Sequence, residues 1–299
     1  MAKRLEHKVI VSIINWNNSE ATNLCLLSIS KIEKASQPDI VLIDNNSQKQ
    51  PLVLNNSILK NLKNFKLIKN SINKGFAAGH NDNIKRALSN SYDFIFLLNN
   101  DVELLDNDLF DKLCVLLLDK NVAGVSPKIL SKNNKDVWYG GGTYSNIFGH
   151  TKHVDLNVSS VQNVNFVSGC CLGINLKLLG NKALFSEDYF LYWEDTDWSV
   201  NKVKEGYTLL YNPNLKVSHD VSSSLGHTSS VYAYYNIRNS FLFMYRCVPW
   251  YFWPTTLLRN HYVLAKYVLL NIYKNSEVKF SQLLRAWWDG LRNVKGPIS

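Results

Sequence analysis

The segment Phe94-Ile95-Phe96-Leu97-Leu98-Asn99-Asn100-Asp101-Val102 joins an apolar run to a short polar tip. Consecutive apolar residues of this kind predict a strand that is buried on both faces, as in a parallel sheet covered by helices. A carboxylate directly after such a strand lies at the rim of the sheet, where open α/β sheets bind their ligands. Asp101 is therefore the first candidate for a functional residue.

The chain on either side alternates between strand-like and helical patterns, which is typical of a parallel sheet with crossover helices. No glycine pattern of a dinucleotide-binding site or a P-loop follows any of the strands. We expect strands at 8–14, 39–43, 65–68, 92–98, 122–130 and 165–173, and helices at 19–30 (with Ser19 as N-cap), 79–88, 107–119 and 195–205.

From residue 229 onward the pattern is mainly helical and is broken by Pro249 and Pro254. The sequence thus predicts an α/β fold with a mostly parallel central sheet at residues 1–225, followed by a C-terminal helical region at 226–299. The charged N-terminus has no apolar stretch before a cleavage site, so no signal peptide is expected. The five cysteines lack disulfide or metal-ligand spacing, which favours buried thiols in a reducing compartment.

The C-terminal region is basic and aromatic: residues 238–299 hold nine Lys/Arg, two Asp/Glu and thirteen aromatic residues. Charges at Arg246, Arg259 and Lys266 interrupt every apolar stretch before it reaches the about 18 residues of a spanning helix. An amphipathic tail that lies on an anionic membrane surface fits this composition. A helical subdomain packed on its own core, or on a second copy in a homodimer, fits it equally. Nucleic-acid binding is not expected.

Three predicted strands end in polar residues, at Asn15-Trp16-Asn17, Asp44-Asn45-Asn46-Ser47 and Asn99-Asn100-Asp101. One such loop is explained by turn formation. Three loops on one edge of a parallel sheet predict a binding crevice.

Two further segments carry chemistry. Residues 73–81 (NKGFAAGHN) form a small-residue loop that opens a helix, and its free N–H groups suit a phosphate. Residues 190–197 (FLYWEDTD) place three carboxylates at a helix start behind an aromatic run. One acid there is explained by the helix dipole. A carboxylate held against an aromatic wall is also a candidate general base.

Taken in order, seven segments resemble inverting family 2 glycosyltransferases of the GT-A fold, and in particular the bacterial rhamnosyltransferase-like branch that builds cell-surface polysaccharides. They span roughly residues 8–245. The segments are VIVSIINWN (9–17), LIDNNS (42–47), NKGFAAGHN (73–81), LLNNDV (97–102), FVSGCCLGIN (166–175), FLYWEDTDWSVNKVKEGY (190–207) and YYNIRNSFLF (234–243).

The resemblance implies a donor site for a dTDP- or UDP-linked sugar. Asp44 resembles the acid that contacts the pyrimidine base, with Asn15 and Asn17 beside it. Asn73 and Gly75 resemble the loop that runs along the nucleotide and its diphosphate.

The resemblance also implies a metal on that diphosphate. Asn100 and Asp101 occupy the end of a D-x-D-type motif, and only Asp101 is acidic here. His219 matches a late histidine that completes the metal site, and Arg238 matches a basic residue that meets the diphosphate. Oxygen ligands suit Mg²⁺ or Mn²⁺, and a histidine ligand favours Mn²⁺.

By the same resemblance, Asp195 is the catalytic base and Glu194 positions the acceptor, while Gly169 and residues 140–142 line the sugar pocket. We expect a metal-dependent inverting enzyme that moves rhamnose from dTDP-rhamnose to a glycan or a lipid-linked oligosaccharide, at the cytoplasmic face of the inner membrane. The alternatives are a transferase that uses a UDP-hexose and a non-catalytic nucleotide-binding partner in a polysaccharide assembly complex. A nucleotidyltransferase is disfavoured, because the loop after the first strand lacks glycines and basic residues.

Overall fold

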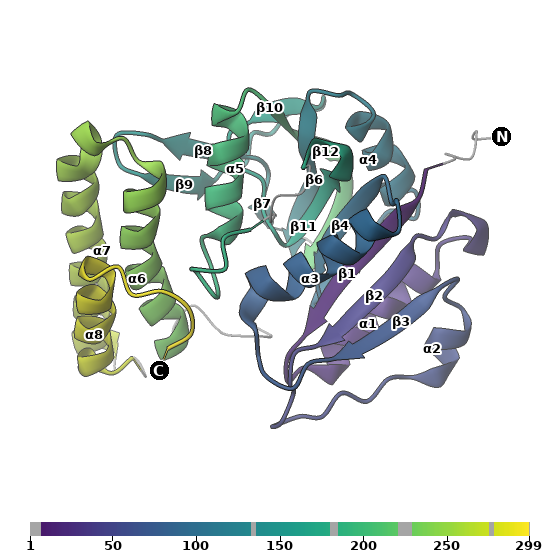
Figure 1. The fold of residues 1–299 in the computed structure, drawn as a ribbon, viewed down its shortest axis with the longest axis horizontal. Coiled ribbons are helices and arrows are strands. Elements are labelled where there is room, and N and C mark those ends of the chain that lie inside the picture. The colour runs from purple at the N-terminus through teal and green to yellow at the C-terminus, as the bar shows by residue number, and fades with distance from the viewer. Residues whose placement is uncertain (1–6, 133–135, 180–184, 221–228, 275–277, 299) are drawn as a thin grey trace.

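The computed structural model describes residues 7–132, 136–179, 185–220, 229–274 and 278–298. Its centre is a ten-stranded sheet in the order β10-β12-β6-β11-β4-β1-β2-β3, with β5 paired to β12 and β7 to β6 (Figure 1). The strands are β1 (Val9–Asn15), β2 (Asp39–Asp44), β3 (Phe65–Lys69), β4 (Phe94–Asn99), β5 (Val102–Leu104), β6 (Val122–Ser131), β7 (Val137–Tyr139), β10 (Gln162–Val164), β11 (Cys171–Asn175) and β12 (Thr208–His219).

The first half of the sheet is parallel, as predicted: β1 pairs with β2 and β4, and β2 pairs with β3. Helices α1 (Ser19–Ser30), α2 (Asn56–Lys60) and α3 (Gly75–Ser89) connect these strands, and short 3-10 turns follow at η1 (Lys34–Ser36) and later at η2 (Leu176–Leu178). Two boundaries differ from the expectation. The N-cap of α1 is Asn18, whose side chain accepts a hydrogen bond from Ala21 N–H, so Ser19 is the first helical residue. Helix α3 begins four residues earlier than predicted.

The second half of the sheet is mixed. Strand β11 runs antiparallel to both β4 and β6, and it begins at Cys171, later than the predicted 165. The long strand β12 then returns parallel to β6 and antiparallel to β5, so that His219 pairs with Val102. This pairing brings the end of β12 to the polar tip after β4. Helices α4 (Leu109–Leu117) and α5 (Glu194–Lys204) complete this half, together with the separate hairpin of β8 (Gly142–Ser145) and β9 (His150–His153).

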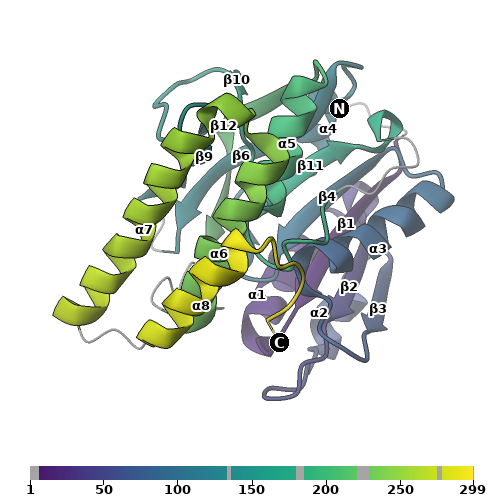
Figure 2. The ribbon, with the colours of Figure 1, turned by 60° about the vertical axis from the view of Figure 1, so that its left-hand side comes forward.

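The C-terminal region is a layer of helices beside the sheet domain, and the β8–β9 hairpin extends toward it (Figures 1 and 2). Its elements are α6 (Ser230–Cys247), η3 (Trp250–Phe252), α7 (Trp253–Lys274) and α8 (Phe280–Leu291). Pro249 ends α6, whereas Pro254 is tolerated in the first turn of α7, where no N–H partner is lost. Within the described residues, no helix is both long and apolar enough to cross a membrane.

Buried side chains of these helices form a hydrophobic core that is separate from the core of the sheet domain. The core also takes in Tyr189, Trp193 and Val200, from the segment around the start of α5. The helical layer therefore packs directly on the segment that carries the acidic motif. The expected boundary between residues 225 and 226 lies outside the described residues. All five cysteines are buried and free, as predicted.

Candidate active site

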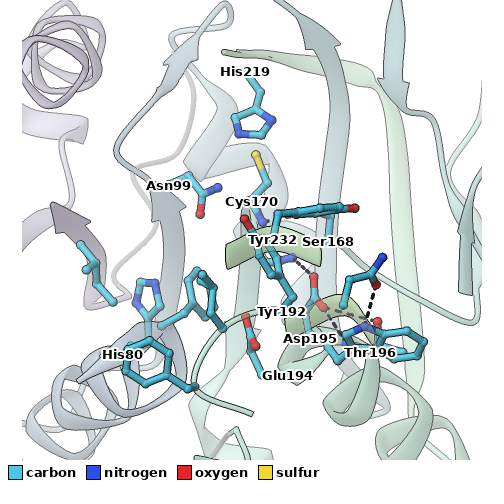
Figure 3. A pocket seen from close by; sticks show the side chains of 18 of the residues that line it. His80, Asn99, Ser168, Cys170, Tyr192, Glu194, Asp195, Thr196, His219 and Tyr232 are labelled. Carbon is cyan, nitrogen blue, oxygen red and sulfur yellow. Dashed lines mark hydrogen bonds between the residues drawn. The ribbon is translucent and has the colours of Figure 1, made fainter. Parts of the chain in front are cut away.

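A cavity of about 470 Å³ opens where the strand ends of the sheet meet the start of α5 and the C-terminal helices. Figure 3 shows Glu194 and Asp195 entering it from one side, with Asn99 and His219 on the other. Eight of the predicted site residues line it: Asn73, Gly75, Asn100, Asp101, Gly169, Glu194, Asp195 and His219.

Asp101 and His219 meet although 118 positions separate them in the chain. The antiparallel pairing of β12 with β5 places His219 Nε2 3.2 Å from Asp101 Oδ1, and both side chains are buried. The indole of Trp138 packs edge-on against the imidazole, with ring centroids 4.7 Å apart. The predicted pair of metal-binding residues is therefore assembled and held in a fixed orientation.

Asn15 and Asp44 lie just behind the cavity wall and form one buried hydrogen-bond network with Asn100. Asn15 Nδ2 donates to Asp44 Oδ1 at 3.1 Å, and Asn15 Oδ1 accepts from Thr22 Oγ1 at 2.8 Å. Asn100 Nδ2 donates to the same hydroxyl at 3.0 Å. Because buried polar groups need partners, this network fixes the relative positions of three strand ends.

Asn17 follows β1 and contacts the loop after β2, and it does not line the cavity. It has a φ of 53°, and its Oδ1 accepts from the N–H groups of Lys49 and Gln50, so it organises the loop after β2. Residues 140–142 are also absent from the cavity lining: Gly142 packs on Phe166 at the start of β8.

Asn73 and Gly75 form a tight turn at the start of α3. Asn73 Oδ1 accepts from Gly75 N–H at 2.9 Å and from Asn45 Nδ2 at 2.7 Å. Gly75 has a φ of +78°, and a Cβ there would lie 2.2 Å from the carbonyl oxygen of Phe190. Only glycine lets this loop approach the segment before α5. Asn45, which lines the cavity, was not among the predicted site residues.

Glu194 and Asp195 occupy the first turn of α5 and differ in their partners. Asp195 Oδ2 accepts from Gly169 N–H at 2.9 Å, and Oδ1 accepts from Thr196 N–H at 2.7 Å. Glu194 is buried, and its Oε2 has no hydrogen-bond partner among the described residues. One carboxylate is thus held rigidly while the other keeps an oxygen available for a ligand.

Burial raises the pKa of both acids. For Glu194, burial and then the neighbouring Asp195 charge raise the pKa to about 8. For Asp195, burial raises the pKa, while the N–H groups of Gly169 and Thr196 act in the opposite direction. Hydrogen bonds to the charged form favour it, so Asp195 is the better-stabilised carboxylate of the pair.

The third acid of the motif, Asp197, has a structural role. Its Oδ2 accepts from Arg246 Nε at 2.7 Å and from Tyr189 Oη at 2.8 Å, and its Oδ1 accepts from Asn201. Asp197 ties α5 to α6 and is not part of the cavity lining.

The segment before α5 is strained and is held from α6. Phe190, Tyr192 and Trp193 have φ values of 65°, 66° and 77°. Left-handed conformations of bulky residues cost of order 1–3 kcal/mol each and persist only when the surroundings enforce them. Asn239 Nδ2 supplies that constraint by donating to the carbonyl oxygens of Tyr189, Leu191 and Tyr192 at 3.1, 2.8 and 2.9 Å.

The predicted contact of Arg238 with the donor diphosphate is corrected by the structure. Its side chain is fully buried and does not line the cavity. Its guanidinium donates to the carbonyl oxygens of Tyr189 and Gly296 at 2.7 and 2.6 Å, and to Asn239 Oδ1. The N–H groups that would bind a diphosphate are therefore used to hold the strained segment and the C-terminus.

A different arginine, Arg259 of α7, lines the cavity. Its guanidinium lies over the ring of Trp193, 5.4 Å from the centroid. His80 also lines the cavity, and burial lowers its pKa to about 3, so the imidazole is neutral. His80 belongs to residues 73–81, the glycine-containing segment already predicted to bind a phosphate. In contrast, nothing in the local sequence distinguishes Arg259 from the other basic residues of the C-terminal region.

A divalent metal would have two protein ligands here. The described residues contain no group of three or more His, Cys, Asp or Glu side chains that could hold a metal ion. Asp101 and His219 nevertheless offer a carboxylate and an imidazole, a donor set that suits Mn²⁺. His219 Nδ1 is buried without a hydrogen-bond partner among the described residues, so Nε2, which faces Asp101, is the nitrogen that would bind a cation. Asp101 and His219 would therefore hold a divalent cation only together with ligands supplied from outside the protein.

The family model of glycosyl transferase family 2 matches residues 10–181. The N-acetylglucosaminyl-diphospho-decaprenol L-rhamnosyltransferase of Mycobacterium tuberculosis is 28% identical over 81 residues, which cover 27% of this chain and 26% of that protein. The chain thus aligns over about a quarter of the length of the curated relatives it matches.

Solved structures extend the likeness to the whole fold. The mannosyltransferase PcManGT from Pyrobaculum calidifontis, solved with GDP-Man and Mn²⁺, has a TM-score of 0.58 at 14% identity and covers 98% of this chain and 88% of that one. A TarS fragment from S. aureus in complex with UDP has a TM-score of 0.53 at 16% identity and covers 96% and 81%. At these identities the likeness establishes the fold alone, and it confirms the GT-A prediction.

Proposed function

The chain belongs to glycosyl transferase family 2, and on that premise we propose that it transfers a sugar from a nucleotide-diphosphate donor to a glycan or a lipid-linked acceptor, with inversion at the anomeric carbon. One observation carries the proposal. The acid pair at Glu194 and Asp195 lines the same cavity as the Asp101–His219 pair, and Figure 3 shows His219 on the side opposite the two acids. A base and a diphosphate site on opposite sides are what a direct displacement requires.

Rhamnose from dTDP-rhamnose is the donor we propose first. It is supported by the rhamnosyltransferase relative, which shares 28% identity over 81 residues. A UDP-hexose donor is the alternative, because a structural neighbour was solved with UDP. The nucleotide would be held by Asn73 and Gly75, which line the cavity, and by Asn15 and Asp44, which lie just behind its wall.

The reaction follows from the positions of the acids. Asp195 takes the proton of the acceptor hydroxyl as that oxygen attacks the anomeric carbon, and the nucleoside diphosphate leaves on the opposite face. Burial raises the pKa of Asp195, which makes it a stronger base than an exposed aspartate. Glu194, whose pKa is raised to about 8, stays protonated at neutral pH and donates a hydrogen bond to the acceptor.

Asp101 and His219 would hold Mn²⁺ or Mg²⁺ on the donor diphosphate. The bound cation would neutralise the charge that develops on the leaving group. The Mn²⁺ in the neighbouring mannosyltransferase supports this assignment.

A panel of donors tests the proposal. We would measure thermal stabilisation and slow donor hydrolysis with dTDP-rhamnose, UDP-glucose, UDP-galactose, UDP-GlcNAc and GDP-mannose, each with Mn²⁺, Mg²⁺ or EDTA. One donor should stabilise the protein in a metal-dependent way, and Asp101→Asn should abolish the metal dependence. The surface variant Asp108→Asn is the matched control. Stabilisation by none of the donors would overturn the proposal, and donor binding without hydrolysis or transfer would favour the non-catalytic partner.

We further propose that the C-terminal helices rest on an anionic membrane surface. Exposed apolar side chains form one stripe along α7 and the turn before it, and the region is rich in Lys and Arg. The stripe consists of Trp250, Tyr251, Leu258, Tyr262 and Leu269. Cosedimentation with anionic vesicles at low salt tests this. If the protein does not cosediment with the vesicles but forms dimers that Tyr262→Glu disrupts, the stripe is instead a homodimer interface.

A further inference from the structure

Arg259 is the only lysine or arginine among the described residues that line the cavity. It projects from α7 and lies over the ring of Trp193, which directly precedes Glu194. The guanidinium is therefore close to the acid pair, on the helical side of the cavity.

Nothing in the described residues balances the charge of Arg259. Its guanidinium donates through Nη1 to Asn260 Oδ1 at 3.0 Å, and no carboxylate among the described residues forms an ion pair with it. Burial lowers its pKa to about 10, which leaves it protonated at neutral pH. A half-buried cation without a counter-charge is costly, so an anionic ligand would be bound favourably at this point.

The surroundings of Arg259 separate it from the proposed donor site. Trp193 donates through Nε1 to Asn236 of α6 at 3.0 Å, and Arg259 helps to lower the pKa of His150 on β9. The Asp101–His219 pair lies instead just before β5 and at the end of β12, and Figure 3 shows His219 on the opposite side from Glu194 and Asp195. Arg259 thus belongs to the half of the cavity that the acceptor would enter.

The same helix connects the cavity to the exposed apolar stripe. Leu258 directly precedes Arg259 and is 73% exposed, and Tyr262 follows one turn later at 69%. A ligand with an anionic group at Arg259 and an alkyl chain attached to it could lie along α7. Such a ligand would use both the charge of Arg259 and the exposed apolar side chains of α7.

We propose that Arg259 binds a phosphate or diphosphate group of the acceptor, adjacent to the sugar that is attacked, and that the acceptor's lipid chain lies along the exposed face of α7. This inference rests on the proposed function and specifies its acceptor. The planar guanidinium suits bidentate contacts with phosphate oxygens, which a lysine ammonium cannot reproduce.

The experiment is a binding titration with geranyl diphosphate, which carries a diphosphate on a short lipid chain. It is carried out by calorimetry on the full chain. The proposed donor site is first saturated with Mn²⁺ and the nucleoside diphosphate that the donor panel selects. Geraniol and inorganic pyrophosphate are the comparison ligands. We expect Arg259→Gln to weaken binding of geranyl diphosphate at least about tenfold and Arg259→Lys to weaken it less. Lys266→Gln, an exposed charge on the same helix, should leave it within about twofold.

Three outcomes would overturn the inference. The first is equal affinity, or no measurable affinity, of the parent chain and Arg259→Gln for geranyl diphosphate. The second is a loss of nucleotide affinity in Arg259→Gln, which would place Arg259 on the donor diphosphate. The third is pyrophosphate binding as tightly as geranyl diphosphate, which would assign the site to a free diphosphate. If the panel selects no nucleotide, the titration is run without one, so failure of the proposed function stays distinguishable from failure of this inference.

Discussion

The cavity has a wall of strand ends on one side and a wall of helices on the other, and the two are stabilised differently. The strand-end wall is held by a network of amides and a hydroxyl on Asn15 of β1, Thr22 of α1 and Asn100 after β4. The helical wall depends on a strained segment, Phe190–Trp193, which Asn239 and Arg238 hold from a distant helix. The strands of the first wall follow from local sequence patterns, although its Asp101–His219 contact also needs β12 to pair with β5. The second wall exists only when α6 is docked.

The largest expected contrast is between Asp195, which lines the cavity, and Asp197, which lies two residues later and does not. Asp195→Asn should lower transfer by roughly 10²–10⁴-fold, because the base is lost, while donor affinity is kept. Asp197→Asn should lower stability instead, because Arg246 loses its buried partner. Transfer rates and melting temperatures of both variants check this. Normal transfer by Asp195→Asn would show that the base is misassigned.

Asn239→Ala tests whether the helical wall needs its clamp. The carbonyl oxygens of Leu191 and Tyr192 lose this donor, whereas that of Tyr189 keeps the guanidinium of Arg238. We therefore expect transfer to fall about 10–100-fold and stability to fall by about 1–3 kcal/mol. Nucleotide affinity, which depends on the other wall, should stay unchanged. Steady-state kinetics and denaturant unfolding measure the two effects. A variant that loses stability but keeps its turnover number would mean that Asn239 is only structural.

Asp44→Asn tests the strand-end wall. The amide would replace a carboxylate oxygen that accepts from Asn15 and Ser47, and the contact implied with the base would be lost. We expect nucleotide affinity to fall about tenfold. Binding of geranyl diphosphate at Arg259 should not change. A parallel loss of both affinities would mean that the two walls are coupled.

The remaining contrast concerns pH and Glu194. Its pKa is raised to about 8 in the folded chain, so the native state holds a proton that the unfolded state releases near pH 4.5. Stability from this group is therefore present at low pH and is lost as pH rises from about 4.5 to about 8. The melting temperature of the parent chain should fall relative to Glu194→Gln over that range. Glu205→Gln, at the other end of the helix, should run parallel to the parent chain.

Much of the strand-end wall could be predicted from the sequence. Alternating strand and helix patterns gave the parallel strands within a few residues, and the polar residues after them meet at one edge. Helix starts were less accurate: α3 begins at Gly75 because that loop packs on Phe190, a contact that no local pattern reveals.

The helical wall was predicted less well. Arg238 matched a family segment, but it is buried beneath the strained loop, and Arg259 lines the cavity in its place. Among basic residues of an amphipathic tail, composition cannot tell which one faces a cavity. That choice depends on how α6 and α7 pack against the segment before α5.

By itself, the sequence determined the α/β sheet and the rim position of Asp101, because these depend on local periodicity and spacing, and its seven segments carried the resemblance to the family. Only the tertiary structure decided which of Glu194, Asp195 and Asp197 face the cavity, and which arginine joins them. The reason is physical: β12 must pair with β5, and α6 must hold a backbone segment that is unstable alone, before those side chains acquire their partners.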